Sequence, residues 1–266
     1  MVLGLVLSAG PRPAAAEPQP AERRILVSAA ISLTDALGEI AAEFERGTGV
    51  GVDVNVGASS SLARQIIEGA PVDVFLSADA AQMDRVEHAG RLVPGSRVDL
   101  LSNQLVVVTP VDRGLDVTRV QDLQRETVRR VAIADPAAVP AGVYARAHLE
   151  RLDLWATLQP KLIPTANVRA VLAAVDSGDV DAGFVYRTDV AMATRSRIAF
   201  EVPIDESTPI RYPLAIGRAT RDLEAARRFA AFLRGPEAAR IFRRRGFVVI
   251  EAVGVSPDRQ PGRDPA

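Results

Sequence analysis

Short apolar runs alternate with segments of helical periodicity along the chain from Ile25 onward. In the first helical segment Leu33, Leu37, Ile40 and Phe44 recur on one face, and glycines follow where that helix should end. The pattern predicts strands over residues 25–27, 50–56, 71–76, 104–110, 131–134 and 182–186, with strand-like runs near Val202 and Leu214. It predicts one further helix that begins near Ser61 and four others over residues 142–152, 168–177, 222–233 and 236–245.

This alternation of strands and helices is typical of α/β proteins, in which helices cover both faces of a parallel sheet. It occurs in two blocks with no long low-complexity linker between them, which predicts two lobes joined by crossing strands. Ligands of such sheets bind beyond the carboxyl ends of the strands, where the helices begin. We therefore expect a binding cleft between the lobes.

Composition narrows the class of protein. The 266 residues are 48% hydrophobic and 24% charged with a net charge of -1, which suits a soluble globular protein and gives no electrostatic basis for binding nucleic acid or an anionic membrane. There is no cysteine, so disulfides and thiolate metal sites are excluded. The two histidines, His88 and His148, lie far apart in the sequence and predict no metal cluster.

The ends of the chain differ from its middle. An apolar run over residues 2–9 and an A-x-A site over residues 14–16 are typical of a secretory signal. No basic segment precedes the run, so either the start lies inside the true signal or this is a Pro/Ala-rich leader; the pattern favours the signal. We predict a signal and disordered leader over residues 1–23, lobe 1 over 24–103 plus 204–250, lobe 2 over 104–203, and a disordered tail over 251–266.

Four predicted helix starts share small or neutral side chains. Ser32 precedes one of them in "SAAISLTDAL", with Asp35 at the spacing of a capping box; the others are "ASSSLARQI", "VPAGVYARAHL" and "TANVRAVLAAV". A helix start presents unpaired backbone N–H groups and a positive dipole end, which bind anions. Ordinary capping explains any one start alone. Four together, two from each block, favour an anion site, with Arg64 and Arg169 expected on solvent-facing sides of their helices.

The chain resembles the periplasmic molybdate-binding proteins of bacterial molybdate ABC transporters. The resemblance covers residues 24–250 and is carried, in family order, by "SAAISLTDAL", "ASSSLARQIIEGAPVDVFLSAD", "NQLVVV", "DPAAVPAGVYARAHLERLDLW", "NVRAVLAAVDSGDVDAGFVYRTD" and "LRGPEAARIFRRRGF". It implies the two-lobed type II architecture of periplasmic binding proteins, with mixed sheets flanked by helices and the ligand in the interlobe cleft.

The resemblance also implies which residues bind the oxyanion: Ser32, Ser59, Ala141, Val168 and Tyr186. The two serines would offer hydroxyl and backbone N–H groups, Ala141 and Val168 backbone N–H alone, and Tyr186 its phenol O–H. Molybdenum would be present only within bound molybdate, with no direct protein–metal ligand and no cofactor. Ile31 departs from the family pattern, which usually has alanine at this position.

A site made of donors suits molybdate, which is a dianion without a proton at neutral pH and only accepts hydrogen bonds. Phosphate usually carries a proton and favours an acceptor such as a carboxylate, which none of the five positions supplies. The same reasoning does not separate molybdate from tungstate or sulfate, because these ions differ mainly in size.

The function implied is that of a monomeric periplasmic receptor, not an enzyme, which captures molybdate or tungstate and delivers it to an ABC permease in the inner membrane. An effector-sensing domain of a transcriptional regulator is one alternative. It predicts a helix-turn-helix before Ile25, and the preceding residues show no helical period. A serine hydrolase is another alternative, but no base accompanies the serines.

Overall fold

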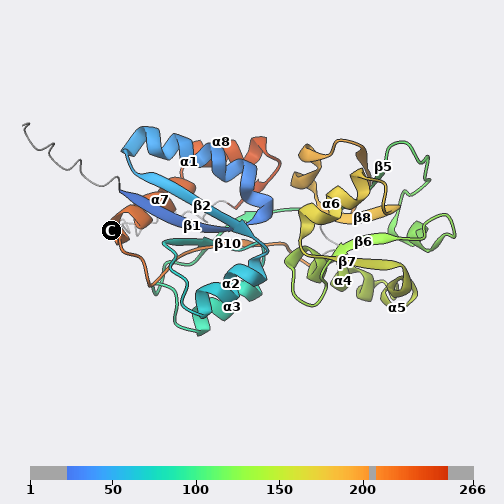
Figure 1. Cartoon of the computed structure of the whole chain (residues 1–266), viewed down its shortest axis with the longest axis horizontal. Helices are drawn as coiled ribbons and strands as arrows, with labels where there is room; N and C mark the ends of the chain where they lie inside the picture. The colour runs from blue at the N-terminus through green and yellow to red at the C-terminus, as the bar shows by residue number, and fades with distance from the viewer. Residues whose placement is uncertain (1–22, 204–207, 251–266) are drawn as a thin grey trace, which may run out of the picture.

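The computed structural model describes residues 23–203 and 208–250, which form two lobes, each built on one β-sheet (Figure 1). Within these residues the first lobe has a six-stranded sheet in the order β11-β4-β10-β3-β1-β2. Its strand β1 pairs in parallel with β2 and β3, whereas β10 runs antiparallel to β3 and β4. The strands are β1 (Arg24–Ala30), β2 (Gly51–Gly57), β3 (Val74–Leu76), β4 (Val98–Ser102), β10 (Tyr212–Ile216) and β11 (Val248–Val249).

Helices cover both faces of this first sheet (Figure 1). One face carries α1 (Thr34–Thr48), α7 (Leu223–Leu233) and α8 (Pro236–Arg244), and the other carries α2 (Ser59–Ile67) and α3 (Ala80–His88). The apolar face predicted for α1 is buried against the sheet, with Leu37 and Ile40 fully shielded from solvent. Phe44 closes this layer by packing edge-on against Phe229 of α7, with ring centroids 5.0 Å apart.

The second lobe has a sheet in the order β7-β6-β8-β5-β9. Strand β6 is parallel to β7 and β8, and β5 is antiparallel to β8 and β9. Helix α6 lies over one face, and α4 and α5 lie over the other (Figure 1). The elements are β5 (Leu105–Pro110), β6 (Val131–Ala134), α4 (Pro140–Arg151), α5 (Trp155–Leu158), β7 (Leu162–Thr165), α6 (Val168–Asp176), β8 (Ala182–Tyr186) and β9 (Ser196–Glu201).

The chain crosses between the lobes twice (Figure 1). The first crossing runs from β4 to β5 through Asn103 and Gln104, and the second returns from β9 to β10. The lobe boundary expected at 203/204 lies at the edge of residues 204–207, which are outside the described residues, as are residues 1–22 of the expected signal and leader and the whole expected tail. None of the helices in the described ranges is long and apolar enough to span a membrane.

The α/β class and the mixed sheets are confirmed, whereas the parallel sheets predicted from periodicity alone are wrong. The reason is topological. Strand β10 returns from the second lobe and enters the first sheet antiparallel to its neighbours, and β5 enters the second sheet antiparallel to β8.

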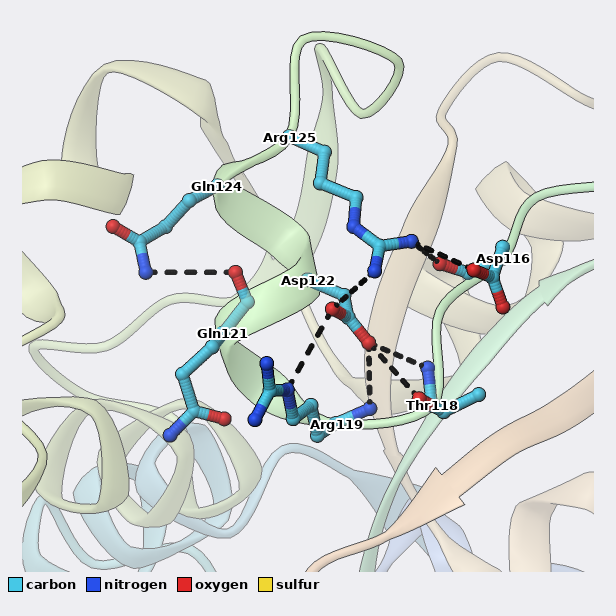
Figure 2. A network of polar contacts seen from close by, with 7 residues as sticks. All are labelled: Asp116, Thr118, Arg119, Gln121, Asp122, Gln124 and Arg125. Atoms are coloured by element: carbon cyan, nitrogen blue, oxygen red, sulfur yellow. Dashed lines mark hydrogen bonds and ion pairs between the residues drawn. The ribbon is translucent and has the colours of Figure 1, made fainter.

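The connection between β5 and β6 is held by one buried carboxylate (Figure 2). Asp122 lies in the short helix η2 (Val120–Gln124), and its Oδ2 accepts hydrogen bonds from the Thr118 backbone N–H at 2.9 Å, the Thr118 hydroxyl at 3.1 Å and the Arg119 backbone N–H at 3.1 Å. Arg125 forms an ion pair with Oδ1 at 2.9 Å. The backbone bond from Thr118 is the largest cause that holds the pKa of Asp122 below its ordinary value.

Candidate functional site

A cavity lies between the two lobes, and residues of both line it. All five residues predicted to bind an oxyanion lie in this lining. The first lobe contributes Ala30, Ile31, Ser32, Gly57, Ala58, Ser59 and Ala78, and the second contributes Val139, Pro140, Ala141, Asn167, Val168 and Tyr186. The structure thus brings together positions that are up to 154 residues apart in the sequence, from Ser32 to Tyr186.

Four helix starts meet at the cavity. Ser32 lies in the 3-10 turn η1 (Ile31–Leu33) that leads into α1, and Ser59 is the first residue of α2. Ala141 is the second residue of α4, and Val168 is the first residue of α6. The first N–H groups of a helix have no partner within the helix and carry its positive dipole end. The cavity wall therefore includes hydrogen-bond donors from both lobes.

The two serine hydroxyls are not used as helix caps. The capping box expected at Ser32 and Asp35 is wrong, because α1 begins only at Thr34 and its N-cap, Leu33, makes no side-chain bond. Ser59 likewise lies inside α2, after the uncapped start at Ala58. Its Oγ accepts a hydrogen bond of 3.0 Å from the Ala78 backbone N–H, which leaves the Ser59 hydroxyl hydrogen free to point into the cavity.

Tyr186 presents a buried hydroxyl with no protein partner. Its side chain is 1% exposed at the end of β8, and its Oη has no hydrogen-bond partner in the structure. Burial raises the pKa of the Tyr186 phenol well above its ordinary value, so the group keeps its proton and can only gain by donating it. A buried donor without an acceptor is costly, so this hydroxyl is available to donate to a ligand in the cavity.

Local packing fixes the two helix starts of the second lobe. In α4, a Cβ placed on Gly142 would lie 2.0 Å from the Ala134 carbonyl oxygen, so only glycine lets the helix start approach the end of β6 this closely. In α6, the Asn167 side chain caps the helix by accepting a hydrogen bond of 3.0 Å from the Ala170 N–H. Both arrangements fix helix starts whose first residues line the cavity.

The cavity lining contains no charged residue. Among the nearby arginines, Arg64 is exposed as expected, whereas the solvent-facing position expected for Arg169 is wrong. Arg169 on α6 contacts Asp35 of α1, with Nη2 to Oδ2 at 2.6 Å, and so joins the two lobes. Its Nε also lies 3.0 Å from Oδ1 of Asp189, an ion pair without the alignment of a hydrogen bond.

Asp189 is fully buried and holds Tyr186 in place. Its Oδ2 accepts a hydrogen bond of 3.2 Å from the Tyr186 backbone N–H. Burial raises the pKa of Asp189 above its ordinary value, and the Arg169 guanidinium opposes that rise. The sequence analysis did not link Asp189 to the site, nor Tyr212 and Asn103, which lie behind Ser32. The only sequence feature that marks these residues is a polar side chain within or next to an apolar strand.

The arrangement fits an oxyanion and not a metal cation. Among residues 23–203 and 208–250, no group of three histidine, cysteine or carboxylate side chains gathers to hold a metal ion. The cavity offers hydroxyl and N–H donors without a carboxylate, which is the donor set that a deprotonated anion accepts from. No catalytic base lies among the lining residues either.

Known proteins share both the sequence and the fold of this chain. The family of bacterial extracellular solute-binding proteins matches residues 25–248. The molybdate-binding protein ModA of Escherichia coli is 37% identical over 232 residues, which cover 86% of this chain and 90% of that protein.

Two solved structures extend the match. The periplasmic molybdate-binding protein of Azotobacter vinelandii has a TM-score of 0.76 at 27% identity and covers 84% of this chain and 98% of its own. The substrate-binding domain assigned to a molybdenum ABC transporter of Clostridium difficile has a TM-score of 0.69 at 34% identity, over 86% and 99% of the two chains. The chain belongs to the family of bacterial extracellular solute-binding proteins that includes the molybdate-binding proteins.

Proposed function

We propose that this protein binds molybdate, and also tungstate, in the interlobe cavity and delivers it to an ABC permease. The observation that carries the proposal is the meeting of four helix starts and an unpartnered buried Tyr186 hydroxyl around a cavity without any carboxylate. The names of the relatives, which are molybdate-binding proteins, support the choice of oxyanion.

The donors are sufficient in number for tight binding. Ser32, Ser59, Ala141, Val168 and Tyr186 would each donate to the dianion, and hydrogen bonds to a charged group contribute about 1.5–3 kcal/mol each, roughly 7–15 kcal/mol together. Ordering costs lower this sum. A micromolar dissociation constant requires about 8 kcal/mol, so binding needs no lysine or arginine in contact with the ligand.

Closure of the two lobes completes the proposed cycle. The lobes would close around the ligand by bending at the two crossings, exclude water, and present a closed surface to the permease. The protein would act as a monomer outside the cytoplasmic membrane and release the oxyanion chemically unchanged. Membership of a family of extracellular solute-binding proteins supports this location and the absence of catalysis.

Competition calorimetry tests the proposal. Titration with molybdate should show one saturable site, tungstate should compete for it, and phosphate should bind more weakly. Ser59→Ala should weaken molybdate binding by about 1.5–3 kcal/mol because it removes one donor to the ion. Ser60→Ala is the matched control, because Ser60 is the next residue of α2 and does not line the cavity. Phosphate binding more tightly than molybdate would contradict the donor-only site.

A further inference from the structure

Behind Ser32, away from the cavity, lies a second layer of buried polar groups. The Ser32 Oγ is 3.0 Å from the Oη of Tyr212 on β10, and that Oη accepts a hydrogen bond of 3.2 Å from the Nδ2 of Asn103. Ser32, Tyr212 and Asn103 are 5%, 0% and 6% exposed, respectively. A continuous line of hydrogen bonds therefore connects the first crossing between the lobes to the cavity wall.

Asn103 determines which group donates and which accepts in each of these hydrogen bonds. Its Oδ1 accepts a hydrogen bond of 2.9 Å from the Gln104 backbone N–H, which fixes which side of the amide carries the nitrogen. The Nδ2 then donates one hydrogen to the Thr188 Oγ1, at 2.9 Å, and the other to the Tyr212 Oη. Both amide hydrogens and the carbonyl oxygen are used, so the amide cannot flip without losing bonds.

The direction at Asn103 determines where the other hydrogens point. Because Tyr212 accepts from Asn103, the phenol hydrogen of Tyr212 needs an acceptor, and the Ser32 Oγ lies within reach. Burial raises the pKa of Tyr212, so the phenol keeps this hydrogen. If Ser32 donated to Tyr212 instead, a buried phenol hydrogen would be left without a partner, which is unfavourable. The Ser32 hydroxyl therefore accepts from Tyr212 and turns its own hydrogen into the cavity.

We propose that Asn103 and Tyr212 are positioning residues that hold the Ser32 hydroxyl as a donor toward the cavity, and thereby favour fully deprotonated oxyanions over protonated ones. This inference rests on the proposed function and explains how the same cavity distinguishes protonated from fully deprotonated ligands. Ser59 is held in the same way by a single bond from the Ala78 N–H. Neither Asn103 nor Tyr212 lines the cavity, so each acts through Ser32.

A double-mutant cycle tests the relay, with calorimetric titration of molybdate and phosphate into each purified protein. Asn103→Asp keeps the shape of the side chain but replaces the donor with an acceptor. Tyr212 then donates to residue 103, Ser32 donates to Tyr212, and Ser32 turns a lone pair toward the ligand. We expect the affinity for molybdate to fall by at least about tenfold, and the preference for molybdate over phosphate to fall with it.

Tyr212→Phe breaks the relay while keeping the ring. In this background Asn103→Asp should weaken molybdate binding by less than about threefold, because residue 103 no longer reaches Ser32. An equal loss in both backgrounds would overturn the inference, since charge or packing at position 103 would then act without the phenol. A wild-type protein that does not bind molybdate would instead contradict the proposed function.

A second comparison applies if Asn103→Asp does not fold. Tyr212→Phe alone leaves the Ser32 hydroxyl without a fixed direction, so that Ser32 can accept from a protonated anion. The preference for molybdate over phosphate should then fall severalfold. Tyr144→Phe is the control, because it removes the phenol oxygen of a half-buried tyrosine on α4 that does not line the cavity. An unchanged preference in Tyr212→Phe would overturn the inference.

Discussion

Tyr186 carries the most direct test of the site at the scale of a single residue. Tyr186→Phe keeps the buried ring and its edge contact with Tyr212, at 6.0 Å between centroids, and removes the unpartnered hydroxyl. Without ligand, the protein should be no less stable, because the lost group made no hydrogen bond. Molybdate affinity should fall by about 1.5–3 kcal/mol, measured by calorimetry.

The pH dependence of this loss follows from the Tyr186 pKa. Burial raises the pKa of the phenol above the ordinary value of about 10, so the group stays protonated through neutral and mildly alkaline solution. The affinity difference between the wild type and Tyr186→Phe should therefore be the same at about pH 7 and about pH 9. A difference that disappears over this range, or no difference at all, would remove Tyr186 from the binding site.

Individual residues of the cavity differ in how well the sequence predicts them. Ser32 and Ser59 stand out because hydroxyl residues at a helix start are a local pattern, and the family resemblance adds Ala141, Val168 and Tyr186. Tyr212 and Asn103 have no such pattern. Tyr212 is 180 residues from the serine it contacts, so their pairing depends on how β10 enters the sheet and not on any local spacing. The same applies to Arg169, whose partners lie on two other elements.

At the scale of elements, Asp122 shows how one carboxylate holds the connection between β5 and β6 (Figure 2). Three donors and the Arg125 guanidinium surround its carboxylate, whose side chain is 4% exposed. Asp122→Asn removes the charge and replaces one acceptor oxygen with a donor. The free energy of unfolding should decrease by about 1.5–3 kcal/mol, measured by urea denaturation.

The sign of the pH effect follows from the lowered pKa of Asp122. A carboxyl group that ionises more easily when folded adds stability above its unfolded pKa of about 3.9, and that stability is lost as the pH falls through the folded value. The wild type and Asp122→Asn should therefore differ at neutral pH and converge in acid. Asp116→Asn is the control, because Asp116 is 79% exposed and its ion pair with Arg125 at 2.9 Å should contribute less than about 1 kcal/mol. Equal losses in the two variants would contradict a special role for Asp122.

Elements with strong periodicity were predictable, and short elements were not. Helix α1 and strand β1 have clear apolar patterns, and the structure places them close to the expected residues. The sequence analysis did not predict helix α3 or strands β4 and β7. Most of the nine residues of α3 are not buried, so its apolar pattern is weak. These elements lie at the periphery or pair with neighbours distant in sequence, so tertiary packing and not local propensity decides their conformation.

At the scale of the whole molecule, the two lobes are tied across the cleft by an ion pair beside the cavity. Arg169 of α6 reaches Asp35 of α1 at 2.6 Å, and their side chains are 20% and 32% exposed. Arg169 is also held from within its own lobe by Asp189. Because Asp35 and Arg169 belong to different lobes, their contact forms only when the lobes approach each other, and in the proposed cycle it favours the closed state that would retain the ligand.

Asp35→Asn should consequently weaken ligand retention without disturbing either lobe. It removes the interlobe attraction but leaves the Arg169–Asp189 pair, so no buried charge is left unpaired. A partly exposed pair of this kind contributes about 0.5–1 kcal/mol, which predicts a two- to fivefold higher dissociation constant for molybdate and a smaller effect at high salt. Asp53→Asn is the control, because Asp53 pairs with Arg24 at 2.6 Å within the first lobe and should leave binding unchanged. If both variants bound molybdate as the wild type does, closure would depend on the ligand and the crossings alone, and the ion pair would have no part in it.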